Sequence, residues 1–519
     1  AVGKVGSGKS LIAHLAPVAL DCKVGIVFTT SNTVKPLYDR FLKETQPNFY
    51  TEPIRVMSYD VLSSEGSTDL LNRFADNYGD SMVIVCDEAH KLRSLEAART
   101  LRVARFLNEH PNVPFIALTG TFTKDSFADF AHLAYWSLRD RSPVPIPHDK
   151  AELEAWSAVC DADTSPNNWQ KGVFAPVVHW AGIDAARWLD EPPISAKPKA
   201  WQAFNKRFRT TPGVVVSGSA DGYQGGLEIE RRVIDVPSVI QSHMQTVTDT
   251  DTKPNGDPIE DDNDVWRILK QLSCGFYYVW RWPNDKPDYD WLEAKRAWSR
   301  AVRYEIKNAS RSGYDSAKLV ASIISAEADK GGRREIHRVW REWDMHRHKR
   351  WFGERTPPRA AIWLSAFLLE DALQWVRDLA EPVLIWYRSS ALRGALQACG
   401  VKVYGPGEQI PEHTAHTAAA SIHSHGTGVN LQAWRKCIIL ESSSSGEVNE
   451  QLLGRTHRDG QKASGVYWGL YAHTEAYKDA WRKAVTEAKY IEGTSGFQQK
   501  LTLAKVKVTR VHQLTTGGV

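Results

Sequence analysis

Residues 3–10 read GKVGSGKS and match the P-loop pattern G-x-x-x-x-G-K-[ST] at every fixed position. Glycines in this pattern let the backbone turn tightly, so that successive N–H groups point at phosphate oxygens. Lys9 is then placed to reach the β- and γ-phosphates, and the Ser10 hydroxyl to ligate Mg²⁺. The apolar segment 11–20 suits the helix that follows a P-loop. The alternative interpretation is a Gly/Ser-rich loop at a flexible terminus.

The residues before the P-loop are unusual. A P-loop follows a buried strand, and here only Ala1 and Val2 precede Gly3. The chain also begins without Met. These features predict a chain that is truncated at its N-terminus and a first sheet that lacks its P-loop strand.

Length and composition set the broad class of the protein. A chain of 519 residues with 42% apolar and 24% charged residues is typical of a globular protein with two or three domains. The six cysteines lie far apart without a C-x-x-C pair, which argues against a zinc site or a disulfide framework and favours a reducing cytosol. No apolar run reaches the roughly 18 residues of a membrane span. We therefore expect a cytoplasmic protein without a membrane partner.

Short apolar segments alternate with helical patterns at both ends of the chain, which predicts an α/β fold with parallel sheets. Between them lies a helix-rich region with most of the 20 tryptophans. Strands are predicted at 24–29, 54–58, 83–86, 114–118, 383–387, 401–404, 418–422, 437–440 and 466–471, helices at 34–44, 291–311 and 336–350, and an exposed acidic loop at 249–264. The predicted domains are 1–142, an insertion at 143–378, a second α/β domain at 379–491 and a tail at 492–519.

The string DEAH, Asp87 to His90, follows the predicted strand 83–86 directly. A carboxylate at a strand tip near a P-loop can hold Mg²⁺, while its neighbour can orient or deprotonate an attacking water. Alone, such a string is more often the charged start of a helix. Its place after a strand favours the catalytic interpretation.

Residues 451–461 read QLLGRTHRDGQ. Arg455 and Arg458 are three residues apart, which predicts that they share one face of a helix. Presented to a triphosphate from a second domain, two arginines can stabilise the charge that develops on the γ-phosphoryl group. The alternative, a solvated basic helix, explains the arginines but not the surrounding Gln and Gly pattern.

The order of these motifs resembles that of superfamily 2 helicases, closest to the Swi/Snf-like branch and its relatives in phages and viruses. The resemblance covers about 1–140 and 380–475. Phe122 departs from it, because the branch usually has proline there, and the region of Thr29 and Thr30 lacks the usual proline of the first nucleic-acid motif. The matching segments are GKVGSGKS, MSYDVL at 57–62, DEAH, TGT at 119–121, LSCGFYY at 272–278, GTGVNLQ at 426–432 and QLLGRTHRDGQ.

The resemblance implies two RecA-like domains and assigns a role to each residue that occupies a motif position. Glu88 would be the catalytic base, and Gln451, Arg455 and Arg458 would complete the site from the second domain. His90, Thr119, Gly120 and Thr121 would couple hydrolysis to domain movement. ATP would be bound by Gly3, Gly6, Ser7, Gly8, Lys9, Ser10 and Gly428, and Mg²⁺ by Ser10 and Asp87.

The insertion is basic. Residues 295–359 carry 17 Lys and Arg against 8 Asp and Glu. We expect its cationic face to follow a nucleic-acid backbone, and its tryptophans, among them Trp298, Trp340, Trp343 and Trp351, to form its core rather than to stack on bases. The arginines proposed for nucleic-acid contact are Arg296, Arg300, Arg303, Arg334, Arg338 and Arg341.

The expected function is that of an ATP-dependent DNA helicase or translocase, with ATP and Mg²⁺ as cofactors. Its expected partner is nucleic acid, in the first place DNA, together with replication or repair proteins in a phage-infected or virus-infected cell. Two alternatives stay open: a P-loop switch or scaffold without motor activity, and an RNA helicase. The second-domain arginines speak against the switch.

Overall fold

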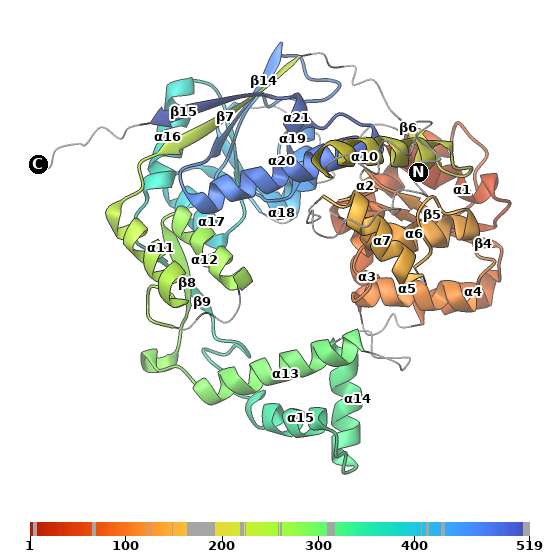
Figure 1. The fold of residues 1–519 in the computed structure, drawn as a ribbon, viewed down its shortest axis with the longest axis horizontal. Coiled ribbons are helices and arrows are strands. Elements are labelled where there is room, and N and C mark those ends of the chain that lie inside the picture. The colour runs from red at the N-terminus through yellow and green to blue at the C-terminus, as the bar shows by residue number, and fades with distance from the viewer. Residues whose placement is uncertain are drawn as a thin grey trace, which may run out of the picture. The chain divides into compact units, whose positions relative to one another are not determined.

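The computed structural model describes two compact units. Unit 1 comprises Ala1–Gly218 and Trp280–Arg359, and unit 2 comprises Ser219–Val279 and Ala360–Val519. Both contain parallel sheets and many helices, so the α/β class is confirmed (Figure 1). No helix within the described ranges is long and apolar enough to cross a bilayer. The described residues are 1–3, 8–64, 69–120, 122–124, 126–147, 149–162, 193–217, 223, 225–257, 259, 262–308, 317–405, 407–411, 415–426 and 431–511.

Unit 1 is built on a four-stranded parallel sheet in the order β3-β2-β4-β5. Strands β2 and β4 lie in its centre, and every one of their residues is buried, as expected for the apolar runs VGIVFT and MVIVCD. The predicted strands are all confirmed within one residue of each boundary. They are β2 (Val24–Thr29), β3 (Ile54–Ser58), β4 (Met82–Asp87) and β5 (Phe115–Leu118).

The prediction that the P-loop strand is missing is wrong. Val2 and Gly3 form a short buried strand, β1 (Val2–Gly3), which pairs in parallel with β6 (Val216–Ser217). On its other side, the N–H of Gly3 donates to the carbonyl oxygen of Thr119 at 3.0 Å. Hydrogen bonds to residues on both sides hold this strand. The P-loop strand therefore lies beside the end of β5.

Helices surround this sheet and supply its core. The predicted helix 34–44 begins earlier, at Ser31, and its last turn is a π-helical turn, Phe41–Thr45. Ala13 and Ala16 of α1 pack against Val27 and Val85 of the two central strands. The helices are α1 (Lys9–Ala19), α2 (Ser31–Arg40), α3 (Tyr59–Ser63), α4 (Leu70–Tyr78), α5 (Ala98–Glu109), α6 (Ala128–Leu138), α7 (Lys150–Cys160) and α10 (Pro193–Thr210).

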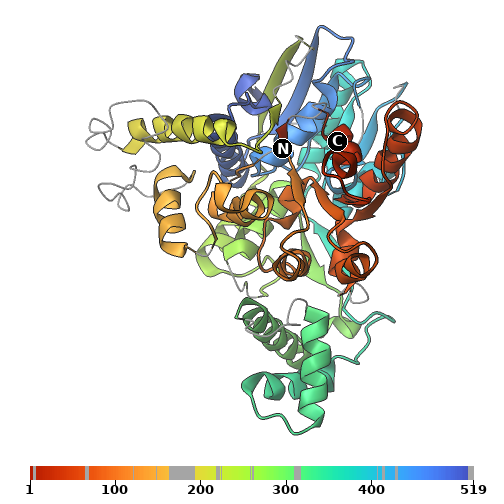
Figure 2. The same cartoon turned by 90° about the vertical axis from the view of Figure 1, so that its right-hand side faces the viewer.

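The second segment of unit 1 contains three helices that pack on one another: α13 (Tyr289–Lys307), α14 (Ala317–Asp329) and α15 (Glu335–His346), green in Figures 1 and 2. Two of them correspond to the helices predicted at 291–311 and 336–350. Trp298 and Trp340 lie in the core of this group, 8% and 5% exposed, with ring centroids 4.9 Å apart. Trp351 is also buried. The prediction that the tryptophans are core residues is confirmed for these three.

Unit 2 is built on a seven-stranded parallel sheet in the order β11-β12-β10-β13-β14-β7-β15. The five strands predicted in this part of the chain are confirmed to within one residue. They are β10 (Leu384–Tyr387), β11 (Lys402–Tyr404), β12 (Ala418–Ser421), β13 (Lys436–Ile439) and β14 (Gly465–Tyr471). A separate pair joins β8 (Phe276–Trp280) to β9 (Arg359–Trp363).

Two strands of this sheet were not predicted: β7 (Gly226–Ile234) and β15 (Lys505–Val511). Charged residues interrupt both sequences, GLEIERRVI and KVKVTRV, so neither reads as an apolar run. In β7, Glu230 and Arg232 are buried and paired, whereas Glu228 is exposed and Arg231 is half-buried. Both strands come from segments assigned to the insertion and the tail, 143–378 and 492–519.

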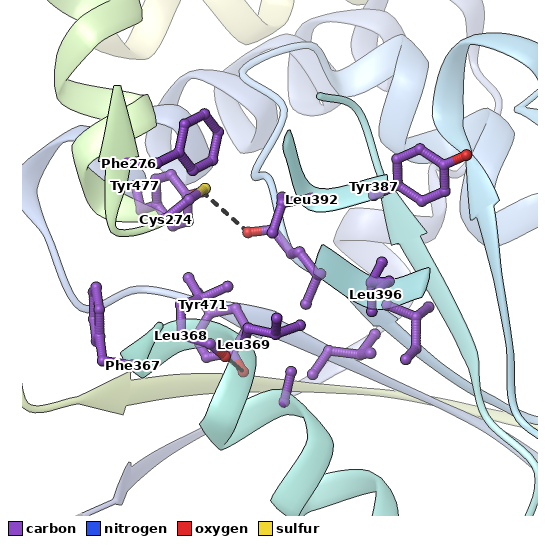
Figure 3. Close-up of a cluster of buried hydrophobic side chains, with 14 of the residues drawn as sticks. Cys274, Phe276, Phe367, Leu368, Leu369, Tyr387, Leu392, Leu396, Tyr471 and Tyr477 are labelled. Carbon is purple, nitrogen blue, oxygen red and sulfur yellow. Dashed lines mark hydrogen bonds between the residues drawn. The ribbon is translucent and has the colours of Figure 1, made fainter. Parts of the chain in front are cut away.

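Apolar clusters cover both faces of the seven-stranded sheet. In one of them the buried Cys274 thiol lies 2.9 Å from the Tyr477 hydroxyl (Figure 3). The Tyr477 hydroxyl itself donates to the Leu440 carbonyl at 3.0 Å. The predicted loop 249–264 is shorter than expected, because helices extend into both of its ends. The helices are α11 (Ser238–Thr250), α12 (Asp262–Ser273), α16 (Phe367–Leu379), α17 (Ser390–Ala398), α18 (Ile422–His425), α19 (Gly446–Thr456), α20 (Glu475–Ser495) and α21 (Lys500–Leu503).

Candidate active site

The P-loop leads into the first turn of α1. Gly8 has φ +85°, a left-handed conformation that favours glycine, and it is the N-cap of the helix. Lys9 and Ser10 are the first two residues of α1, and both are half-buried. Their backbone N–H groups belong to the end of the helix that attracts anions. Two predicted phosphate ligands, Gly6 and Ser7, lie outside the described residues.

The Lys9 ammonium donates a hydrogen bond of 2.6 Å to the carbonyl oxygen of Gly3. Gly3 is the last residue of β1, so this contact joins the two ends of the P-loop. The charge of Lys9 also reaches the DEAH segment, because it lowers the pKa of Asp87.

Asp87 ends β4 and is 8% exposed. Desolvation by burial, and then the neighbouring charge of Glu88, raise the pKa of Asp87 to about 6, against smaller opposing effects of Lys9 and Thr29. The Thr29 hydroxyl donates to the Asp87 carboxylate at 3.1 Å. A buried carboxylate in this state is stabilised by a cation, so the pKa is consistent with a metal ligand.

Sequence reasoning did not assign roles to two residues that hold Asp87. Thr29 ends β2, next to β4, and its side chain is buried. Tyr59 is buried as well, and its hydroxyl donates to the backbone carbonyl of Asp87 at 2.8 Å. Two sequence features could have indicated these residues: a threonine at the end of an apolar strand, and the tyrosine within the segment MSYDVL.

Glu88 has φ +53° and ψ +49°, a left-handed conformation that non-glycine residues rarely adopt. Its carboxylate lies 3.4 Å from Nδ1 of His90, which belongs to the short 3₁₀ helix Ala89–Leu92. The turn therefore places the Glu88 and His90 side chains together directly after Asp87. Such backbone strain is common at functional sites.

Two of the predicted coupling residues, Thr119 and Gly120, lie beside the P-loop strand. The N–H of Thr119 donates to the carbonyl of Ala1 at 3.1 Å, and its carbonyl accepts from Gly3. A Cβ on Gly120 would lie 3.9 Å from the Gly3 carbonyl oxygen. Thr121 lies outside the described residues. Lys9, Asp87, Glu88, His90 and Thr119 thus gather at the carboxyl ends of β1, β4 and β5, where ligands bind in parallel sheets.

The donor set fits ATP with Mg²⁺. A left-handed Gly8 before a helix N-terminus offers backbone N–H groups to phosphates, and Lys9 offers a cation. The Ser10 hydroxyl and the Asp87 carboxylate are oxygen ligands of the kind that Mg²⁺ prefers. Glu88 is a second carboxylate, directly after Asp87 in the chain.

In unit 2, the predicted arginines occupy different environments. Arg455 is 5% exposed, and its Nε donates to the Gly426 carbonyl at 3.1 Å. Its own carbonyl accepts from the N–H of Leu431 at 3.3 Å. Arg455 therefore contacts both Gly426 and Leu431, while the predicted Gly428 lies outside the described residues.

The prediction that Arg455 and Arg458 share a helix face is wrong. Helix α19 ends at Thr456, and Arg458 follows the non-helical residue His457. The buried ring of His457 explains this end, because its Nε2 bonds to the Gly225 carbonyl at 3.0 Å and it packs edge-on against Tyr223. Arg458 is half-buried. Gln451, also half-buried, lies on α19.

The six arginines proposed for nucleic-acid contact fall into two groups. On α13, Arg300 and Arg303 are exposed and Arg296 is half-buried. Those near α15 have partners within the protein. Arg334 pairs with Glu305 and Glu327, Arg338 with Glu335 and Glu342, and Arg341 donates to the Gly332 carbonyl.

Comparison of the chain with protein-family models and with curated proteins finds no match.

Proposed function

We propose that the protein is a nucleic-acid-dependent ATPase of the superfamily 2 helicase type, closest to the Swi/Snf-like branch, and that it moves along or remodels DNA. The observation that carries this proposal is the placement of Lys9 at the start of α1 and of the buried Asp87 carboxylate at the end of β4, where the charge of Lys9 opposes the rise in the pKa of Asp87. A P-loop lysine whose charge acts on a buried strand-end carboxylate belongs to the same site. A Gly/Ser-rich loop that serves only as a scaffold requires neither the lysine nor the carboxylate.

Within this site each side chain has one task. Lys9 binds the β- and γ-phosphates, and Ser10 and Asp87 hold Mg²⁺, which when bound neutralises the charge that develops on the phosphates. Glu88 accepts a proton from the attacking water, and His90, 3.4 Å away, orients the Glu88 carboxylate. In keeping with the resemblance, the two RecA-like domains correspond to the sheets of units 1 and 2, and Gln451, Arg455 and Arg458 assist phosphoryl transfer.

The test is ATP hydrolysis by the full chain, measured alone and with single-stranded DNA, duplex DNA and RNA. We expect stimulation by DNA. Lys9→Ala should weaken nucleotide binding, whereas Glu88→Gln should keep Mg²⁺-ATP binding and lose turnover, because the metal ligand remains while the base is removed. Wild-type turnover in Glu88→Gln overturns the assignment of the base.

Two results discriminate between the alternatives. ATP binding without stimulation by any nucleic acid favours the P-loop switch. Stimulation by RNA alone makes the protein an RNA helicase. The matched control is Glu52→Gln, since Glu52 is a half-buried carboxylate of the same unit that accepts a hydrogen bond from the Tyr50 hydroxyl, outside the site.

A further inference from the structure

Helix α13 has two faces of opposite character. Trp291, Ala294, Trp298 and Val302 are buried and recur at the spacing of one helix face. The opposite face carries what we call the α13 stripe, which consists of Arg296, Arg300, Arg303 and Tyr304. These residues follow one another at steps of four, three and one, so they lie along one side of the helix.

Most of the cations around α13 are already engaged within the protein. Lys295 lies over the rings of Trp280 and Trp291, and Lys349 pairs with Asp288. Arg334 and Arg338 have acidic partners. By contrast, within the described part of the chain Arg300 and Arg303 have no hydrogen bond, ion pair or ring contact, and both are exposed. Their charge is available to an external anion.

The stripe also has exposed aromatic rings. Tyr304 is 67% exposed at one end of the stripe, and Tyr289, on the same side of α13, is 65% exposed. Exposing a large ring to water is unfavourable, and the tryptophans nearby avoid it by forming the core. Rings next to unpaired cations match a ligand that has both negative charge and flat faces.

We propose that the α13 stripe binds single-stranded DNA, with Arg300 and Arg303 on successive phosphates and Tyr304 stacked on an unpaired base. The proposal identifies the substrate on which the proposed motor acts. It rests on the proposed function only in taking the ligand to be DNA. The stripe is a single row whose cations succeed one another at about 4.5–6 Å along the helix. One row of cations follows one strand, and a base is free to stack only where it is unpaired.

The charge part is tested by the salt dependence of binding to a single-stranded oligonucleotide, measured by fluorescence anisotropy on the nucleotide-free full chain. The slope of log K against log salt is about 0.7 for each neutralised phosphate on a single strand. The double variant Arg300→Gln/Arg303→Gln should therefore lower the slope by about 1.4. The control Arg338→Gln removes an exposed charge that is paired with Glu335, so the slope should stay unchanged.

The stacking part is tested with Tyr304→Ala. Loss of one stacked base should weaken binding roughly 5- to 150-fold without changing the salt slope. Tyr304→Trp should restore the affinity. On a strand of the same length with abasic sites, wild type and Tyr304→Ala should bind equally, because no base remains to stack. Tyr50→Ala is the matched control, since Tyr50 is 77% exposed elsewhere in the same unit.

Each other outcome removes a defined part of the proposal. An unchanged slope in the double variant, with an unchanged melting curve, overturns the stripe as a binding surface. Equal dependence of duplex and single-strand binding on the arginines, with no effect of Tyr304→Ala, overturns the choice of a single strand. Equal competition by poly-glutamate overturns nucleic acid as the ligand. None of these results alters the ATPase test, so a failure here is distinguishable from a failure of the proposed function.

Discussion

The hydroxyl of Thr29 donates to the carboxylate of Asp87 at 3.1 Å and joins the ends of the neighbouring strands β2 and β4. This hydrogen bond is one of the few interactions that favour the charged form of Asp87. Burial and the neighbouring charge of Glu88 raise the pKa of Asp87 to about 6. The site therefore keeps a carboxylate in a state that costs folding free energy in the absence of a cation. Under the proposed function, the role of Asp87 in binding a metal ion and its effect on stability oppose each other.

The first prediction concerns the pH dependence of this cost. Because the pKa of Asp87 is higher in the folded state than its ordinary value of 3.8, the folded state binds the proton more tightly, and stability rises as the pH falls from above 6 towards 4. Asp87→Asn should raise the unfolding free energy at pH 7 by about 1–3 kcal/mol, and the gain should vanish near pH 4. The exposed control Asp80→Asn should show no such gain. Thermal unfolding without Mg²⁺ or nucleotide measures both, and a gain that does not depend on pH contradicts the proposed cause.

A second prediction follows from the left-handed backbone of Glu88. A non-glycine residue in this region costs about 1–2 kcal/mol, so Glu88→Gly should raise the unfolding free energy by about 0.5–1 kcal/mol once the greater freedom of glycine in the unfolded chain is included. Turnover should be lost, because the base is removed. Asp21 has φ +54° away from the site, so Asp21→Gly should give a similar gain in stability with turnover unchanged. A lower unfolding free energy for Glu88→Gly would show that the side-chain contacts of Glu88 stabilise the fold by more than its backbone strain destabilises it.

The third prediction separates the two arginines of unit 2. Arg458 lies beyond α19 and is half-buried, so Arg458→Ala should leave the melting temperature unchanged and reduce turnover by on the order of 10³. Arg455 donates to Gly426 from a buried position. Arg455→Ala should therefore also lower the unfolding free energy, by about 1.5–3 kcal/mol. Melting curves and steady-state kinetics on both variants measure these effects. If Arg458→Ala changes only the affinity for ATP, Arg458 binds ATP in the ground state and does not stabilise the transition state.

The elements that sequence reasoning located are those whose pattern is local. Strands such as β4 are continuous apolar runs, and the polar residue after each run marks the carboxyl end of a parallel strand. Glu88 and Lys9 were proposed as site residues because the P-loop and DEAH patterns require fixed residue types at fixed spacing. Patterns of this kind involve only residues that are close in the sequence, so they can be recognised without a structure.

What escaped sequence reasoning depends on partners that are distant in the chain. Strand β7 was missed because the counter-charge that lets Arg232 be buried is Asp371 of α16, more than a hundred residues away. The end of α19 at His457 depends on the carbonyl of Gly225, and the support of Asp87 by Tyr59 crosses two strands. Such pairings arise only when the sheet assembles, so neither periodicity nor spacing indicates them.

The last prediction concerns the charges of β7. Arg232 is buried and makes two hydrogen bonds to Asp371 of α16, at 2.7 and 3.0 Å. The Tyr471 hydroxyl also donates to Asp371, at 2.7 Å. This pair attaches the unpredicted strand to the helix that covers it.

Asp371→Asn should lower the unfolding free energy by about 3–5 kcal/mol, because it leaves the Arg232 charge buried without its main counter-charge. The double variant Arg232→Met/Asp371→Leu should be less damaging than Asp371→Asn alone, since it removes both charges and keeps the volume apolar. Glu381→Gln is the matched control: its pair with Arg435 is exposed, so its loss should cost less than about 1 kcal/mol. Urea unfolding followed by tryptophan fluorescence compares the three variants. If Asp371→Asn costs no more than Glu381→Gln, the buried pair does not hold β7 in the sheet, and the attachment of β7 then depends on its backbone hydrogen bonds to β14 and β15.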